Sequence, residues 1–208
     1  MPRPRFKKLD PEKQSRILEA AASEFGVHGY DGASLNHILA AAGISKGAAY
    51  YYFDDKADLF GTVVHHYLDH VIGGAWVDVS TLTAESFWPA VVQFASQMQA
   101  HVAENAWEMG LAKAIWRMPR GQAERGPLGE VLAPLMGWLR ELTARGQELG
   151  VVRRDLPMDL IVAIIVAMDE ACDTWLSENW EAIGDAEAHR IMLELVHAYR
   201  RVLEPREG

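Results

Sequence analysis

The stretch "SLNHILAAAGISKGAAYYYFDDKADLF", residues 34–60, decides what the sequence predicts about the fold. Two short segments with helical spacing, 35–42 and 46–53, each follow a serine, Ser34 and Ser45 respectively. A serine in that position accepts hydrogen bonds from the first N–H groups of a helix, which have no partner inside the helix. A short turn with one glycine separates the two segments. Two capped helices joined by a tight turn predict a helix-turn-helix.

The second of these helices suits the major groove of DNA. Segment 46–53 would be about 12 Å long at 1.5 Å per residue, and the groove is about 12 Å wide. Ala49 and Phe53 are four apart and share the core-facing side. Because a helix turns about 100° per residue, the tyrosines at 50–52 cannot all lie on that side. A tyrosine that faces outward can bond a phosphate and contact a sugar or a thymine methyl group. The alternative is that these rings pack at a domain junction.

The charge distribution adds to this prediction. The net charge is −9, but residues 1–60 carry eight basic and eight acidic groups, so residues 61–208 hold all the excess acid. Residues 1–16 are net +4. This asymmetry indicates that the N-terminal end faces an anion. We expect residues 2–8, "PRPRFKK", to act as a basic arm along a minor groove or phosphate track, with a merely solubilising tail as the alternative.

Helical spacing recurs through the rest of the chain, and no segment alternates as a strand would. The sequence therefore predicts an all-α protein with an N-terminal three-helix helix-turn-helix domain, residues 1–55, and a C-terminal helical regulatory and dimerisation domain, residues 56–208. The expected helices span 11–28, 35–42, 46–53, 56–72, 84–103, 105–118, 128–148, 157–179 and 185–203.

No motif points to an enzyme or a cofactor. The sequence lacks a glycine-rich phosphate loop, a nucleophile elbow and a recognisable carboxylate pair. His66 and His70, with His65 beside them, could share a metal, but Asp69 is the one acidic residue at a helical offset, and we expect a solvated or interfacial histidine face. Cys172 is expected in the core rather than in redox sensing.

The expected compartment is the cytoplasm, with no membrane association. A single cysteine excludes an internal disulfide and fits a reducing environment. The first residues lack the apolar region of a signal peptide. The most apolar run, residues 160–168, is far shorter than the roughly 20 residues that span a bilayer.

The C-terminal part is rich in tryptophan and methionine, which suit a roomy pocket for an apolar or aromatic ligand, although most such side chains pack in cores by default. The candidate ligand-binding residues are Trp88, Met98, Trp107, Met118, Trp138, Met168 and Trp175. The last two expected helices have wide apolar surfaces, which predict a homodimer interface unless a larger monomer core covers them. The candidate interface residues are Ile161, Ile164, Met168, Leu195, Tyr199 and Val202.

Residues 9–60 resemble the DNA-binding domain of the tetracycline-repressor (TetR) family of bacterial regulators. The likeness is carried by Phe-x3-Gly-Tyr from Phe25, Ile-x4-Gly-Ile-Ser-Lys-Gly from Ile38, Tyr-x2-Phe from Tyr50 and Lys-x2-Leu-Phe from Lys56. The resemblance implies a homodimer, a ligand pocket in the C-terminal domain and, usually, repression of transcription.

The resemblance also assigns DNA-contacting positions. By their place in its motifs, the positions that would contact phosphate are Ser34, Ser45, Tyr50, Tyr52 and Lys56. Those that would face base edges or the nearby backbone are Asn36, His37, Lys46, Gly47, Ala48 and Tyr51. Ala49 departs from the family pattern, which has a larger apolar residue there, and predicts looser packing of the recognition helix.

The expected function is that of a ligand-responsive transcriptional regulator. A dimer would bind double-stranded DNA at a palindromic operator as a repressor. A small, largely apolar effector would release the dimer from the operator. Helix 56–72 would connect the two events. The alternative is a helical small-molecule-binding protein of the same fold without sequence-specific DNA binding. The segment from Lys46 to Lys56 favours the regulator.

Overall fold

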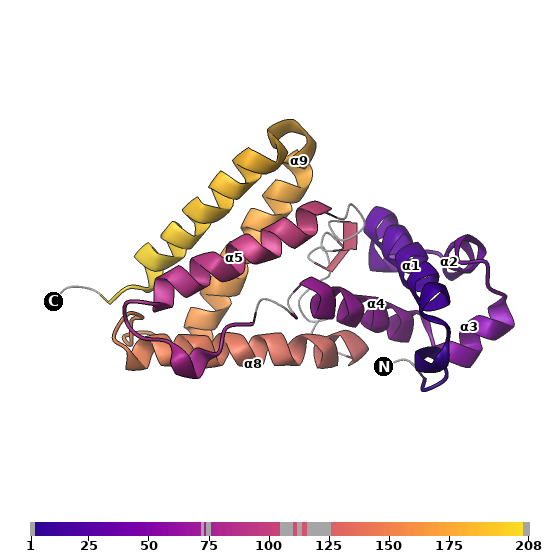
Figure 1. The fold of residues 1–208 in the computed structure, drawn as a ribbon, viewed down its shortest axis with the longest axis horizontal. Helices are drawn as coiled ribbons and strands as arrows, with labels where there is room; N and C mark the ends of the chain where they lie inside the picture. The colour runs from indigo at the N-terminus through magenta and orange to yellow at the C-terminus, as the bar shows by residue number, and fades with distance from the viewer. Residues whose placement is uncertain are drawn as a thin grey trace. The chain divides into compact units, whose positions relative to one another are not determined.

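The computed structural model describes residues 3–71, 73, 76–104, 110–111, 114–115 and 126–205. All regular elements in these residues are helices, so the all-α expectation is confirmed (Figure 1). The chain forms two compact units. The first unit comprises Met1–Val71 and Asn105–Ala133, and the second comprises Ile72–Glu104 and Pro134–Gly208. The first unit thus includes the whole helix after the helix-turn-helix, beyond the expected boundary at residue 55.

Residues 3–71 of the first unit contain one 3-10 helix and four α-helices in chain order. These are η1 (Phe6–Lys8), α1 (Pro11–Gly32), α2 (Leu35–Ala41), α3 (Lys46–Tyr52) and α4 (Lys56–Val71). The α1 helix runs past the expected end at residue 28, although Gly29 has a non-helical backbone. The η1 turn was not expected, because three residues carry no periodicity that a sequence could reveal.

An aromatic cluster forms the centre of this unit. The rings of Phe25 and Phe60 lie 4.7 Å apart between centroids, and Tyr30 lies 5.1 Å from Phe60. The expected inner face of α1 is buried as predicted, and it consists of Ile17, Leu18, Ala21, Ala22 and Phe25. A Cβ at Gly26 would lie 2.8 Å from the carbonyl carbon of Gly110, so the two backbones touch only because residue 26 has no side chain.

The second unit contains η2 (Val79–Thr81), α5 (Phe87–Glu104), the part of α8 (Gly126–Glu148) from Pro134 onward, and α9 (Met158–Leu203). The two helices expected at 157–179 and 185–203 form the single element α9, which turns back on itself (Figure 1). Gly184 makes the turn with φ +70°, a conformation that glycine adopts without steric cost. The Oη of Tyr199 donates to Asp169 Oδ1 at 2.9 Å and ties the second arm to the first.

The core of the second unit joins α5, α8 and both arms of α9. Its buried members are Leu82, Phe87, Trp88, Leu142, Val152, Ile161, Tyr199 and Leu203. Gly146 allows close packing here, because a Cβ at this position would lie 2.4 Å from Val152 Cγ2 and 2.7 Å from Phe87 Cζ. Helix α8 therefore approaches its neighbours more closely than any residue with a side chain would permit.

Candidate nucleic-acid interface

Helices α2 and α3 are capped as the sequence predicts. Ser34 Oγ accepts from the N–H of His37 at 3.4 Å, and Ser45 Oγ accepts from the N–H of Ala48 at 3.2 Å. Gly43 lies between the helices with φ +65°, which a turn of this tightness requires. Its N–H donates to Ala40 O at 3.2 Å. The helix-turn-helix is thus built from local hydrogen bonds that the sequence already specifies.

The three tyrosines of α3 lie on different faces of the helix. Tyr50 and Tyr51 are each 47% exposed, whereas Tyr52 is buried with Ala49 and Phe53. The expectation that Ala49 and Phe53 share the inner side is confirmed, and two of the tyrosines point outward. Tyr52 packs edge-on against Phe53, with 6.5 Å between ring centroids, so it has a structural role whether or not it reaches a phosphate.

The other candidate DNA-binding residues differ in exposure. Those exposed are Asn36, His37, Ser45, Lys46, Gly47, Tyr50 and Tyr51, and those half-buried are Ser34, Ala48 and Lys56. The exposed members come from the start of α2 and from α3. They are the polar and aromatic candidate surface of this unit, and its contact with DNA stays a prediction.

The ammonium group of Lys56 bonds backbone carbonyl groups at the end of α1. Its Nζ donates to the carbonyl oxygens of Asp31 at 3.1 Å and Ala33 at 3.3 Å, and it lies 4.9 Å from the centre of the Tyr30 ring. Carbonyl groups at the end of a helix have a partial negative charge, which favours a cation. Lys56 therefore joins the end of α1 to the start of α4. Because an ammonium group has three N–H donors, these two bonds leave the expected phosphate contact possible.

Glu24 positions the start of α2, and the sequence analysis did not identify it. Its Oε1 accepts from the N–H of Ser34 at 2.8 Å and lies 3.4 Å from His37 Nδ1. The carboxylate thus links α1 to two candidate DNA-binding residues. No pattern could have found this link, because ten residues with a chain reversal separate Glu24 from Ser34.

The N-terminal segment is folded against α3 instead of extending as an arm. Phe6 is only 3% exposed, and its ring centroid lies 4.9 Å from that of Phe53. The N–H of Arg3 donates to Tyr52 O at 3.0 Å. Residues 3–8 are therefore a folded part of this unit, and their expected contact with a minor groove or phosphate track stays a prediction. In the sequence, the signal for this folded N-terminal segment was Phe6, an aromatic residue among basic ones.

Among the candidate ligand-binding residues that the structure describes, Trp88, Trp138 and Met168 gather at the core of the second unit, whereas Trp175 is exposed on α9. Trp88 is in the core of the second unit, and Trp138 packs against this core. The Trp138 Nε1–H donates to Val77 O at 3.2 Å. Met98 and Met168 are half-buried. Trp107 and Met118 lie outside the described residues.

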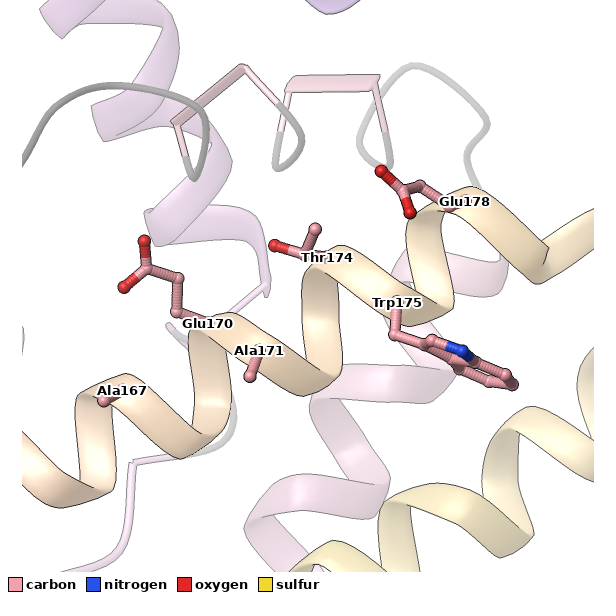
Figure 2. Close-up of a pocket in the computed structure, with 6 residues that line it drawn as sticks. All are labelled: Ala167, Glu170, Ala171, Thr174, Trp175 and Glu178. Carbon is pink, nitrogen blue, oxygen red and sulfur yellow. The ribbon is translucent and has the colours of Figure 1, made fainter.

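Trp175 is 46% exposed and lines an open depression on one stretch of α9 (Figure 2). Its other lining residues are Ala167, Glu170, Ala171, Thr174 and Glu178. All of them come from a single helix, so the depression is too open to enclose a ligand in this monomer.

Most candidate dimer residues have partners within the second unit. Ile161 is fully buried and Tyr199 is nearly so, while Met168 and Leu195 pack against the same core. Ile164 is half-buried, and Val202 is exposed. The apolar stripe that suggested an interface is thus largely explained by the turn of α9, which brings its own second arm over the first.

The histidines of α4 do not assemble a metal site within the described part of the chain, which contains no group of three or more potential ligands. His65 Nδ1 lies 2.8 Å from Asp69 Oδ2, and the rings of His66 and His70 stack 6.4 Å apart. Burial lowers the pKa of His66, and the neighbouring His70 lowers it further. The described helices also include none long and apolar enough to cross a membrane.

Sequence comparison relates the helix-turn-helix to known regulators. Residues 17–63 match the family described as bacterial regulatory proteins, tetR family. The chain is 27% identical to the HTH-type transcriptional repressor SCO4008 of Streptomyces coelicolor, over 94% of this chain and 97% of that one. It is 24% identical to the HTH-type transcriptional repressor AcnR of Corynebacterium diphtheriae, over 93% and 94% of the respective chains.

Solved structures with the same fold cover nearly the whole chain. The fatty acid degradation regulator FadR from Bacillus halodurans superposes with a TM-score of 0.73 at 19% identity, covering 93% of this chain and 96% of that one. FadR from Bacillus subtilis, solved in complex with stearoyl-CoA, has a TM-score of 0.70 at 18% identity, covering 89% and 98%. Both units of the chain therefore have counterparts within one known fold.

Proposed function

We propose that this chain, which belongs to the tetR family of bacterial regulatory proteins, is a ligand-responsive transcriptional repressor that binds a palindromic operator as a dimer. The family consists of transcriptional regulators rather than enzymes, and the proposal includes no catalytic activity. The observation that carries it is the outward face of α3, where Tyr50 and Tyr51 are exposed on a helix capped at Ser45. Because a repressor acts on DNA inside the cell, the proposal places the protein in the bacterial cytoplasm.

In this proposal α3 is the recognition helix. Lys46 and Gly47 are exposed in its first turn, and Tyr50 and Tyr51 are exposed in its second. Side chains with hydrogen-bonding tips suit both phosphate and base edges, and phosphate contacts set the register in which bases are read. Asn36, exposed at the start of α2, would add a bidentate contact to adenine.

A second copy of the chain would cover the exposed face of α9. This face carries Leu160 and Trp175, each 46% exposed, with exposed alanines at positions 163, 167 and 171 between them. Small residues between two large apolar ones allow a partner helix to approach closely. A dimer would present two copies of α3, which must enter major grooves about 34–36 Å apart.

The ligand would bind at partly or largely exposed aromatic residues of the second unit. The Trp138 ring lies 4.7 Å from Phe94 and 5.3 Å from Trp76 between centroids. This cluster is apolar yet only partly covered, as a site for an apolar molecule needs to be. The stearoyl-CoA complex of the Bacillus subtilis FadR supports an effector with a long apolar tail.

Selection from a random duplex library tests DNA recognition. Purified protein should enrich a palindromic site. Each of the two identical helices would read one half-site, and the two-fold symmetry of a dimer orients the half-sites in opposite directions. The competing function, a ligand-binding protein without sequence-specific DNA binding, predicts no enrichment over random duplex. The proposal fails if no sequence is enriched at low salt.

Operator release tests the response to ligand. Stearoyl-CoA, stearate, coenzyme A and a set of aromatic cations should be titrated against tryptophan fluorescence and operator binding. A ligand with higher affinity for the DNA-free state must weaken operator binding, typically about 5- to 150-fold. If every compound that binds leaves operator affinity unchanged, the protein is a DNA-binding regulator without this control.

A further inference from the structure

The N-terminal segment forms a defined structure at the end of the recognition helix, and the proposed function does not yet use it. We call residues 3–8 the N-terminal clamp. Phe6 is its buried anchor, packed between the rings of Phe53 at 4.9 Å and Tyr52 at 6.3 Å. An inserted aromatic ring fixes the place of its neighbours in the chain, and those neighbours include four basic residues: Arg3, Arg5, Lys7 and Lys8.

Arg3 caps the C-terminal end of α3 from outside the helix. The last carbonyl groups of a helix lack partners within it, and α3 has no basic residue of its own in its last turn. The N–H of Arg3 donates to Tyr52 O at 3.0 Å, and its Nη1 donates to Tyr50 O at 3.0 Å. Its Nε also donates to Asp54 Oδ1 at 2.9 Å. The clamp therefore completes a seven-residue helix that is too short to be stable alone.

Arg5 lies over the outward face of α3. Its guanidinium carbon is 4.1 Å from the centre of the Tyr51 ring, and both side chains are exposed. A guanidinium that stacks on a ring keeps several N–H donors that can reach an anion, and it is less strongly hydrated than an ammonium. The stack thus places a cation at the C-terminal end of a recognition helix whose own cation, Lys46, is at its start.

We infer that Arg5 is a further DNA-contacting residue, which binds a backbone phosphate of double-stranded DNA and is aligned for that contact by Tyr51. Phe6 and Arg3 are positioning residues that hold Arg5 there. The inference rests on the proposed function, because it assumes that the outward face of α3 meets DNA. It differs from an extended arm, which would reach a groove independently of α3.

The salt dependence of DNA binding tests the contact. Arg5→Ala should weaken binding to operator and random duplex by the same factor. It should also reduce the slope of log K against log salt by about 0.9 for each protomer bound. Arg190→Ala makes the same charge change at an exposed site in the second unit and should leave the slope as in the wild type. An unchanged slope in Arg5→Ala overturns the inference.

A double-mutant cycle tests the alignment by Tyr51. If the ring holds the guanidinium, then Arg5→Ala combined with Tyr51→Ala should weaken operator binding by less than the product of the two single effects. Arg5→Lys, which keeps the charge but stacks poorly, should recover only part of the loss. Independent single effects, or full recovery with lysine, would show that Tyr51 does not align Arg5.

Two further measurements separate this inference from protein stability and from the proposed function. Arg5→Ala should keep the wild-type melting temperature, because the side chain is exposed. Phe6→Ala should lower the melting temperature and also lose the salt-slope contribution of Arg5. A wild-type chain that binds no duplex contradicts the proposed function, whereas normal operator binding by Arg5→Ala contradicts the inference alone.

Discussion

At the scale of single residues, the site combines side chains that face outward with side chains that hold the backbone in place. Tyr50 and Tyr51 are exposed, whereas the charged groups of Glu24 and Lys56 form hydrogen bonds with backbone groups of neighbouring segments. Charged groups bonded to backbone atoms are stronger partners than neutral ones. Substitutions at the two kinds of residue should therefore differ in whether they change stability as well as DNA binding.

Lys56→Ala should change both quantities. Loss of the bonds to Asp31 O and Ala33 O should lower the free energy of unfolding by about 1 kcal/mol, a modest value because the side chain is half-buried. Loss of the phosphate contact should reduce the salt slope by about 0.9 per protomer. Urea unfolding and salt titration measure the two effects. A stability loss with an unchanged slope would leave Lys56 with its structural role alone.

Tyr51→Ala and Asn36→Ala should relax the choice of bases. A side chain that reads a base edge contributes about 1–3 kcal/mol of discrimination, so each variant should lose preference at particular operator positions. Binding to single-substitution operator variants measures this effect. Tyr51→Phe keeps the ring and serves as the control for the hydroxyl. Equal weakening on operator and random duplex would show that these residues only position the protein.

At the scale of elements, the helices were predictable in existence and less so in extent. Periodicity and serine caps located α2 and α3 to within a residue or so of their observed ends, because both signals are local. Helix α9 was expected as two helices, and the chain does reverse at Gly184. Close packing of elements was not predictable, since it depends on segments that are distant in sequence.

Gly146→Ala should destabilise the second unit. The added Cβ would meet Val152 and Phe87 within van der Waals radii, and overpacking of this kind costs about 1–3 kcal/mol. Gly137 provides a matched control in the same helix, because a Cβ there meets nothing within 4 Å. Gly137→Ala should stabilise by up to about 1 kcal/mol through helix propensity. Equal effects in thermal unfolding would contradict the packing argument.

At the scale of the whole molecule, the proposed repressor requires two copies and a response that links ligand to DNA. The exposed apolar face of α9 differs from the stripe that the sequence suggested, since Ile161 and Tyr199 are buried in the monomer. Assembly is thus best tested on residues exposed in this structure, where a substitution can alter the interface without disturbing the core.

Ala167→Glu together with Ala171→Glu should yield a folded monomer, because a buried interface does not accept unpaired charges. Both alanines are exposed, so the monomer core is untouched. Sedimentation at micromolar concentration measures the change, and operator affinity should fall with it. Ala186→Glu, at an exposed site on the second arm of α9, is the control. A wild-type monomer would refute the dimer, and a variant that stays dimeric would place the interface elsewhere.

The sequence by itself determined the helical fold, the helix-turn-helix and the outward position of at least one tyrosine, because caps, turns and helical periodicity act within a few residues. Only the tertiary structure decided which tyrosines face outward, that Phe6 anchors the N-terminal clamp on α3, and that Lys56 bonds the end of α1. It also decided that Ile161 lies in the core of the second unit. A helix that is apolar on most sides has no preferred inner face until another segment packs against it, and that choice depends on contacts between residues far apart in the chain.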